Sequence, residues 1–142
     1  MSPPLMPGNL PLEHSVKLRV RFAETDAMEV AYYAEYFVWF EVARTELFRS
    51  VGLPYSEVQK RGLHTPVVRA VADYKSSARY DDEVVVKATA TKVGRSSFRL
   101  DYEVLKMPGG ELLCVGHTVH VFVGEDGRPK RISDEIRGKL AG

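Results

Sequence analysis

One long helical pattern stands in a chain whose other segments alternate like strands, and it limits the fold more than any other feature. From residue 33 to 51, apolar side chains recur at three- and four-residue steps, as on one face of a helix. This stripe contains Tyr36, Phe37, Phe40, Ala43, Leu47 and Val51. Gly52 and Pro54 follow as stop signals. Burying several such side chains at roughly 1.5–3 kcal/mol each would make this helix the core of the domain.

Strand patterns flank this helix on both sides. We predict five strands, at residues 14–22, 63–74, 83–93, 97–107 and 111–123. Pro66 places the second strand at a sheet edge or a bulge. The fifth strand is apolar on both faces, which favours a central position. Shorter helices are expected at residues 56–61 and 133–140, the latter with Ser133 as its N-cap.

This order of elements indicates an α+β domain in which an antiparallel sheet packs on one helix. A five-stranded antiparallel sheet wrapped around one long central helix is the hotdog fold, although the pattern alone also permits other α+β sandwiches. The proline-rich residues 1–12 are expected to form a flexible N-terminal arm. Residues 13–142 then form a single domain, as the length of 142 residues suggests.

Composition excludes several function classes. The 20 basic and 19 acidic residues nearly cancel, which argues against a dedicated nucleic-acid binder. No apolar run is long enough to span a membrane. Cys114 is the only cysteine and suits a reducing compartment, so we expect a soluble cytoplasmic protein. His117 and His120 stand three apart in a strand and point to opposite faces, so no metal site is expected.

Asp26 is the candidate for chemistry, because it lies where the first strand hands over to the long helix. The free N–H groups and the positive dipole end of a helix start favour a developing oxyanion. A carboxylate beside such a group suffices for acyl transfer. The simpler interpretation is a helix cap or a loop carboxylate.

Three blocks carry a resemblance to a known family: residues 21–30, residues 32–37, and the set Phe40, Glu41, Ala43 and Arg44. Together they resemble the 4-hydroxybenzoyl-CoA thioesterase family of single-hotdog acyl-CoA thioesterases. Residues 94–98 also look like that family's turn between two central strands. The resemblance implies hydrolysis of an acyl- or aroyl-CoA to the acid and coenzyme A, with no cofactor beyond the substrate. It also implies a homodimer or homotetramer with acyl sites at the subunit interface.

The same resemblance implies roles for individual residues. Asp26 matches the catalytic carboxylate, acting as nucleophile or as general base on water, and the backbone N–H of Tyr33 would polarise the thioester carbonyl. Glu41 on the helix is the reserve acid, although an ion pair with Arg44 is the plainer role. Glu24 is expected to be structural or solvent-facing.

Further residues are expected around the substrate. Those we place in substrate binding are Glu29, Tyr32, Lys92, Arg95, Ser96 and Ser97. The cations among them, with Arg99, would meet the phosphates of coenzyme A; a solvated charged turn is the alternative. Glu29 stands where the family usually carries glycine, which implies an altered loop, a narrower pocket or a second carboxylate near the thioester.

Two other functions stay open. The chain could be an acyl-CoA-binding module without turnover, an idea that Glu29 supports. A hotdog hydratase or dehydratase would want a histidine in the loop or at the helix start, where Tyr32 and Tyr33 stand instead.

Overall fold

The computed structural model describes residues 11–141. Its elements in chain order are β1 (Glu13–Arg19), the 3-10 turn η1 (Phe22–Glu24), α1 (Glu35–Ser50), α2 (Tyr55–Lys60), β2 (Val67–Tyr74), β3 (Glu83–Val93), β4 (Ser97–Lys106), β5 (Glu111–Val121) and α3 (Asp134–Leu140). No helix in this described part is both long enough and apolar enough to cross a membrane.

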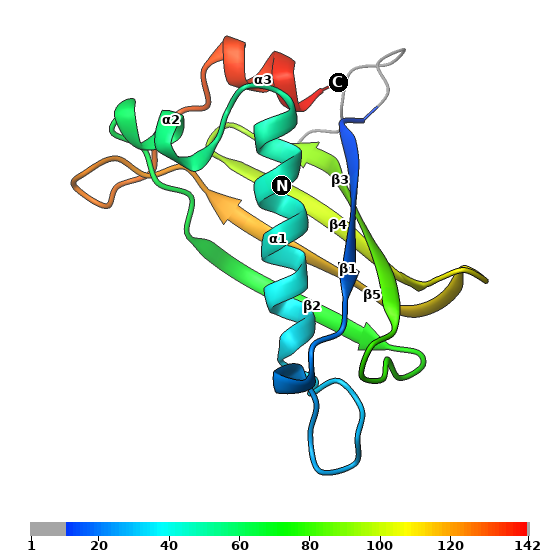
Figure 1. Ribbon diagram of the computed structural model, residues 1–142. Helices are drawn as coiled ribbons and strands as arrows, with labels where there is room; N and C mark the ends of the chain where they lie inside the picture. The colour runs from blue at the N-terminus through cyan, green and yellow to red at the C-terminus, as the bar shows by residue number, and fades with distance from the viewer. Residues whose placement is uncertain (1–10, 142) are drawn as a thin grey trace.

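The five strands form one antiparallel sheet in the order β1-β3-β4-β5-β2. Helix α1 lies across one face of this sheet, and α2 and α3 lie near the C-terminal end of α1 (Figure 1). At the opposite end, a long loop joins η1 to α1. The arrangement confirms the predicted α+β hotdog architecture.

The predicted elements are all present, with shifted bounds. Helix α1 is shorter than predicted, because residues 33 and 34 form a turn before it and Val51 is its C-cap. Strand β1 ends at Arg19, since the chain then turns into η1. Strand β2 begins after Pro66 and is an edge strand with a bulge between Val67 and Arg69, as expected.

The fifth strand is an inner strand, as predicted, because β5 pairs with β4 on one side and with the edge strand β2 on the other; β4 holds the middle position. Most of the predicted arm, residues 1–10, lies outside the described residues. Leu12, at the end of that arm, packs against the core, and its carbonyl accepts a hydrogen bond from the N–H of Ala90 at 2.8 Å.

The helix packs tightly against the sheet at Gly116 in β5. The ring of Phe40 stacks on Tyr102 with centroids 4.3 Å apart, and a Cβ on Gly116 would lie 2.7 Å from the Phe40 ring. The same Cβ would lie 2.4 Å from the carbonyl oxygen of Val71. Gly116 therefore sets how deeply α1 sits on the sheet.

We expect Gly116→Ala to lower the free energy of unfolding by about 1–3 kcal/mol, because the methyl group forces the helix and β2 apart. Urea denaturation followed by circular dichroism measures this. Gly109→Ala is the matched control, since nothing lies within 4 Å of its added Cβ. Equal stability of the two variants would contradict this account of the contact.

Candidate functional site

The loop between η1 and α1 has a regular hydrogen-bonded structure. Thr25 and Ala31 form an antiparallel bridge, and the N–H of Asp26 donates to the carbonyl of Val30 at 2.9 Å. Val30 also bridges to Arg79 in the segment between β2 and β3. The loop is therefore closed on itself and fastened to a neighbouring segment.

The carboxylate of Asp26 is held by the backbone of its own loop. Its Oδ1 accepts hydrogen bonds from the N–H groups of Met28, at 2.9 Å, and Val30, at 3.4 Å. Within residues 11–141, no hydrogen bond is made to Oδ2. Asp26 thus fulfils the loop-carboxylate role and still presents one oxygen to an open pocket of about 650 Å³.

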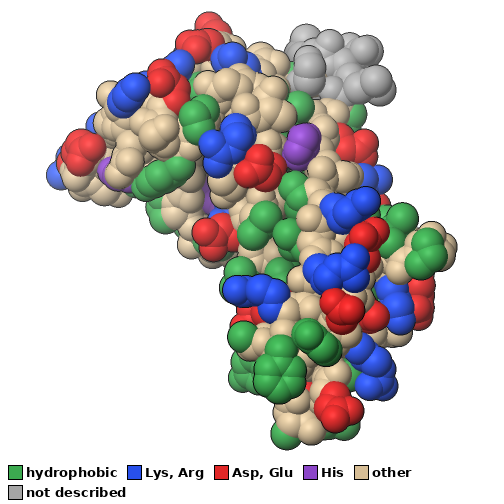
Figure 2. Space-filling model, in the orientation of Figure 1, with side chains coloured by type: hydrophobic (Ala, Val, Ile, Leu, Met, Phe, Trp, Pro, Cys, Tyr) green, Lys and Arg blue, Asp and Glu red, His purple; other side chains and the backbone are tan. Residues whose placement is uncertain are grey.

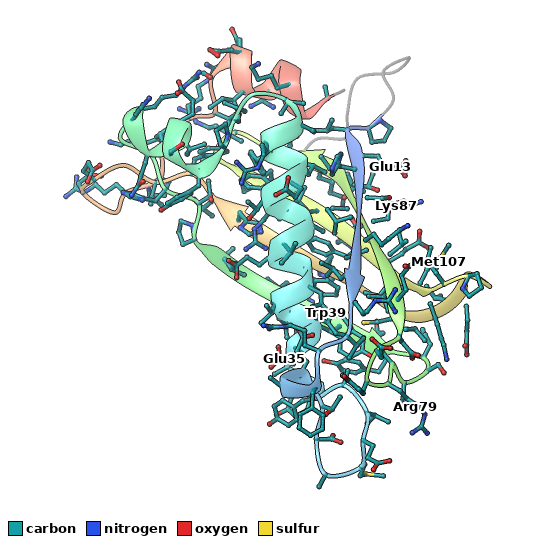
Figure 3. All side chains as sticks on the ribbon, viewed as in Figure 1. Glu13, Glu35, Trp39, Arg79, Lys87 and Met107 are labelled. Carbon is teal, nitrogen blue, oxygen red and sulfur yellow. The ribbon has the colours of Figure 1, made fainter. Side chains whose placement is uncertain are left out.

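That pocket brings Asp26 together with residues from two segments. Its lining residues are Phe22, Ala23, Thr25, Asp26, Glu29, Arg79 and Tyr80. Arg79 and Tyr80 belong to no sequence motif, so sequence analysis did not predict them as site residues. The bridge between Arg79 and Val30 brings their segment to the pocket. Figure 3 shows Arg79 at the same end of the molecule as the loop.

The start of α1 carries unused hydrogen-bond donors. Its N-cap residue is Ala34, which has no side chain that could accept from the first turn. Among the described residues, nothing accepts from the N–H groups of Tyr33 and Ala34. The carbonyl of Tyr33 is fixed by the Tyr74 hydroxyl at 2.7 Å. The peptide groups at the helix start are therefore positioned and open.

Glu24 joins this loop to the helix. Its side chain is buried and accepts hydrogen bonds from the Arg21 N–H and the Trp39 indole N–H, both at 2.8 Å. Figure 3 shows Trp39 on α1, on the side toward β1. Burial alone would raise the pKa of Glu24, but these hydrogen bonds outweigh it and lower the pKa. The structural role expected for Glu24 is confirmed, and solvent exposure is excluded.

Glu29 has a left-handed backbone, with φ of 65°. That is the conformation for which glycine is suited, and a residue with a Cβ pays roughly 1–2 kcal/mol for it. Glu29 is exposed and lines the same pocket as Asp26. The loop thus keeps a glycine-type turn, and its second carboxylate lies beside the first.

Tyr32 lies near the same group. Its ring contacts Tyr33 with centroids 4.6 Å apart. The pKa of Tyr32 is raised, first by its hydrogen bond with Tyr33 and in smaller part by the charge of Asp26. Figure 2 shows hydrophobic side chains gathered at this end of the molecule, where Phe22, Met28, Tyr32 and Tyr33 are exposed.

The predicted cations lie elsewhere. Glu83, at the start of β3, pairs with Arg19 near the loop, and β3 then runs the length of the sheet to Lys92. Nine residue steps along a strand cover about 30 Å. The structure therefore does not bring the turn formed by Arg95, Ser96 and Ser97 close to Asp26 within one chain.

Other expectations are resolved by specific contacts. Arg99 pairs with Asp101 at 2.9 Å, so it is not a free cation of that turn. No ion pair joins Glu41 to Arg44 among the described residues; both line a second pocket beside α1. Within residues 11–141, no three His, Cys, Asp or Glu side chains are placed to hold a metal ion.

Comparisons with known proteins agree on one family. The model of the Thioesterase-like superfamily matches residues 20–140. A putative acyl-CoA thioesterase of Bacillus subtilis is 34% identical over 110 residues, covering 78% of this chain and 79% of that relative. The 4-hydroxybenzoyl-CoA thioesterase of a Pseudomonas species is 28% identical, covering 82% and 87%. The crystal structure of a DHNA-CoA thioesterase from Staphylococcus aureus superposes with a TM-score of 0.80 at 34% identity, covering 84% and 80%.

We expect Glu24→Gln to lower the free energy of unfolding at pH 7 by about 1.5–3 kcal/mol, because an amide cannot accept from both donors as the carboxylate does. The folded state lowers the pKa of Glu24, so its contribution is present above the ordinary glutamate pKa and is lost as the pH falls through the folded value. The difference between wild type and variant should therefore shrink at pH 3.

Urea titrations at both pH values measure this difference. Glu41→Gln is the control, since Glu41 is an exposed glutamate on α1, the helix that carries Trp39. A Glu24→Gln variant as stable as wild type at pH 7, or equally destabilised at both pH values, would contradict the role assigned to this carboxylate.

Proposed function

The chain belongs to the Thioesterase-like superfamily, and from that premise we propose that it hydrolyses an acyl- or aroyl-CoA thioester to the free acid and coenzyme A. Relatives named acyl-CoA thioesterase and 4-hydroxybenzoyl-CoA thioesterase support the reaction class. The observation that carries the proposal is that one loop carries both an open carboxylate oxygen, on Asp26, and unused N–H donors, where the loop enters α1.

The helix start would polarise the thioester. As water or a carboxylate attacks, the carbonyl oxygen gains negative charge, and the N–H of Tyr33 is free to donate to it. One such donor is worth about 3–4 kcal/mol in a transition state. The positive end of the α1 dipole adds to this stabilisation.

Asp26 would supply the second half of the chemistry. Its Oδ1 is fixed by two backbone N–H groups, which sets the direction of Oδ2. That oxygen attacks the thioester carbon to form an anhydride, or it takes a proton from an attacking water. In both routes the thiolate of coenzyme A leaves and is protonated. In the first route water then hydrolyses the anhydride, which releases the acid and restores the Asp26 carboxylate.

Asp26→Asn should lower the rate of coenzyme A release by at least about 100-fold, because an amide is neither a base nor a useful nucleophile. The measurement is thiol release from a panel of acyl- and aroyl-CoA substrates. Glu29→Gln is the control, since it removes a neighbouring carboxylate from the same loop and should leave much of the rate.

Unaltered turnover in Asp26→Asn would exclude the mechanism proposed for this residue. If the wild-type protein binds the substrates and releases no coenzyme A from any of them, the chain is an acyl-CoA-binding module and the proposed hydrolysis is wrong.

We further propose that the protein works as a homo-oligomer built on a dimer through β2. Strands β1 and β2 are the two edges of the sheet. Strand β2 exposes Val67 and Val68 together with one charge of each sign, Arg69 and Asp73. Strand β1 exposes two cations, Lys17 and Arg19, which are charges of the kind that discourage edge pairing. Two β2 strands pairing antiparallel would continue the sheet across both subunits.

This pairing would also bring the separated groups together. Two strands that pair antiparallel run in opposite directions. The end of one subunit's sheet that lies near Asp26 is therefore beside the opposite end of the partner subunit's sheet. The β3–β4 turn of the partner, with Lys92 and Arg95, is at that end. A coenzyme A bound at Asp26 would then place its phosphates toward the partner's cations.

Val68→Lys should convert the dimer to a monomer and lower turnover, because it places like charges on the edges that meet. Sedimentation velocity and thiol release are measured on the same samples. Ser15→Lys, which adds the same charge to the exposed face of β1, should change neither quantity. A Val68→Lys variant that keeps the wild-type mass and rate would exclude the β2 interface.

A further inference from the structure

A second pocket lies beside α1, away from Asp26. It has a volume of about 710 Å³ and is lined by α1, Tyr55, the segment before β2 and the turn after β5. A smaller recess of about 50 Å³ shares Arg44, Thr45, Tyr55 and Thr65 with it. The floor of this recess is apolar and consists of Phe48, Leu53 and Val58.

Arg44 lines both cavities without an acidic partner. Its side chain is half-buried, and among the described residues its one hydrogen bond goes to the hydroxyl of Tyr102, at 3.4 Å. Glu41 is one turn away on α1, but the two form no ion pair. A half-buried guanidinium that contacts only a neutral hydroxyl keeps its charge available for a ligand.

A buried chain of hydrogen bonds holds that hydroxyl, and its direction follows from one carbonyl. Nδ1 of His120 lies 3.1 Å from the Thr65 carbonyl oxygen, which only accepts, so Nδ1 carries the proton. Burial lowers the pKa of His120 to about 4, so Nε2 is a bare acceptor at neutral pH. The Thr118 hydroxyl, 2.8 Å away, must then donate to Nε2.

The directions of the two remaining hydrogen bonds, from Tyr102 to Thr118 and from Arg44 to Tyr102, follow from this one. Because Thr118 donates to His120, its oxygen accepts from the Tyr102 hydroxyl at 2.7 Å. Burial raises the pKa of Tyr102, which therefore keeps that proton. The lone pairs of Tyr102 then face Arg44 and accept from it. The core thus supplies one acceptor for the guanidinium, and the Arg44 side chain also lines both cavities.

We propose that Arg44 binds a carboxylate at the far end of the acyl group, so that the pocket selects acyl-CoA substrates with an apolar body and a distal carboxylate. This proposal rests on the proposed thioesterase function and names its substrate class. A guanidinium fork matches a carboxylate in two parallel hydrogen bonds. Glu41 and Glu125 also line the pocket, and their charges disfavour a phosphate dianion more than a single carboxylate.

The dimer proposed above decides which subunit supplies this pocket. Tyr33 and Arg44 of one chain are about 16 Å apart along α1, too far for a short acyl group. If the two β2 strands pair antiparallel about the midpoint of β2, Tyr74 lies opposite Val67 of the partner subunit. Val67 of the partner subunit is two residues from Thr65 of the partner subunit, which lines the pocket. The partner's pocket is therefore the one that receives an acyl group held at Tyr33.

The test compares glutaryl-CoA with pentanoyl-CoA, which have the same chain length and differ in the distal carboxylate. Calorimetric titration of the Asp26→Asn protein measures binding without turnover. We expect glutaryl-CoA to bind at least about tenfold more tightly than pentanoyl-CoA. Adding Arg44→Gln should abolish the preference and leave pentanoyl-CoA affinity unchanged, while Arg44→Lys should retain part of it.

Thr118→Val breaks the buried chain without touching the pocket and should weaken the preference for glutaryl-CoA. Circular dichroism confirms that each variant is folded. Equal affinities for the two thioesters, or a preference that survives Arg44→Gln, would overturn the proposal. Free glutarate should bind more weakly than glutaryl-CoA; equal binding would show a free-acid site instead.

These outcomes are separable from the proposed hydrolysis. A wild-type protein that releases no coenzyme A while the Arg44-dependent preference stands would refute the hydrolysis and leave the carboxylate site intact.

Discussion

The buried carboxylate of Glu24 is the interaction on which the candidate site depends. It accepts from the backbone of Arg21 and the indole of Trp39, and its own carbonyl accepts from the N–H of Tyr32. A charge this deeply buried is stable only when such donors surround it. Through it, the end of β1, the loop and α1 become one unit. This unit and the bridges within the loop together set the position of Asp26 relative to the helix start.

The same region carries departures from the usual rules of helix and loop stability. Helix α1 begins without a capping side chain at Ala34, and Glu29 holds a left-handed backbone that favours glycine. Both features cost stability, and both occur within a few residues of Asp26. The N–H of Tyr33, which the proposed mechanism uses, lies before the N-cap residue and has no acceptor among the described residues. It is therefore open to a substrate.

Much of the fold could be predicted because its signals are local. Alternation gave the strands, the three- and four-residue spacing gave α1, and Pro66 marked the edge position of β2. The site was predictable only in part. Asp26 was found from its place in the chain and from a family resemblance. For Glu24 the sequence left a structural role and solvent exposure both open, because its partner Trp39 lies 15 residues away on α1.

The remaining features depend on which strands pair, and no local pattern contains that information. Lys92 and Arg95 were grouped with Asp26, yet the register of β1 with β3 puts them at the other end of the sheet. The chain of hydrogen bonds behind Arg44 joins residues from α1, β4, β5 and the segment before β2. Only the folded sheet brings these residues together, so sequence analysis saw Arg44 as a partner for Glu41.

The central claim is that each active site combines Asp26 from one subunit with the pocket beside α1 of the other. Subunit mixing tests it directly. Asp26→Asn removes the carboxylate, and Thr45→Trp fills the pocket that Thr45 lines. Each variant alone should be inactive. In a mixed dimer, one site carries both changes and the other carries neither, so purified mixed dimers should recover about half of the wild-type rate of coenzyme A release. Mixed dimers as inactive as their parents would contradict the account.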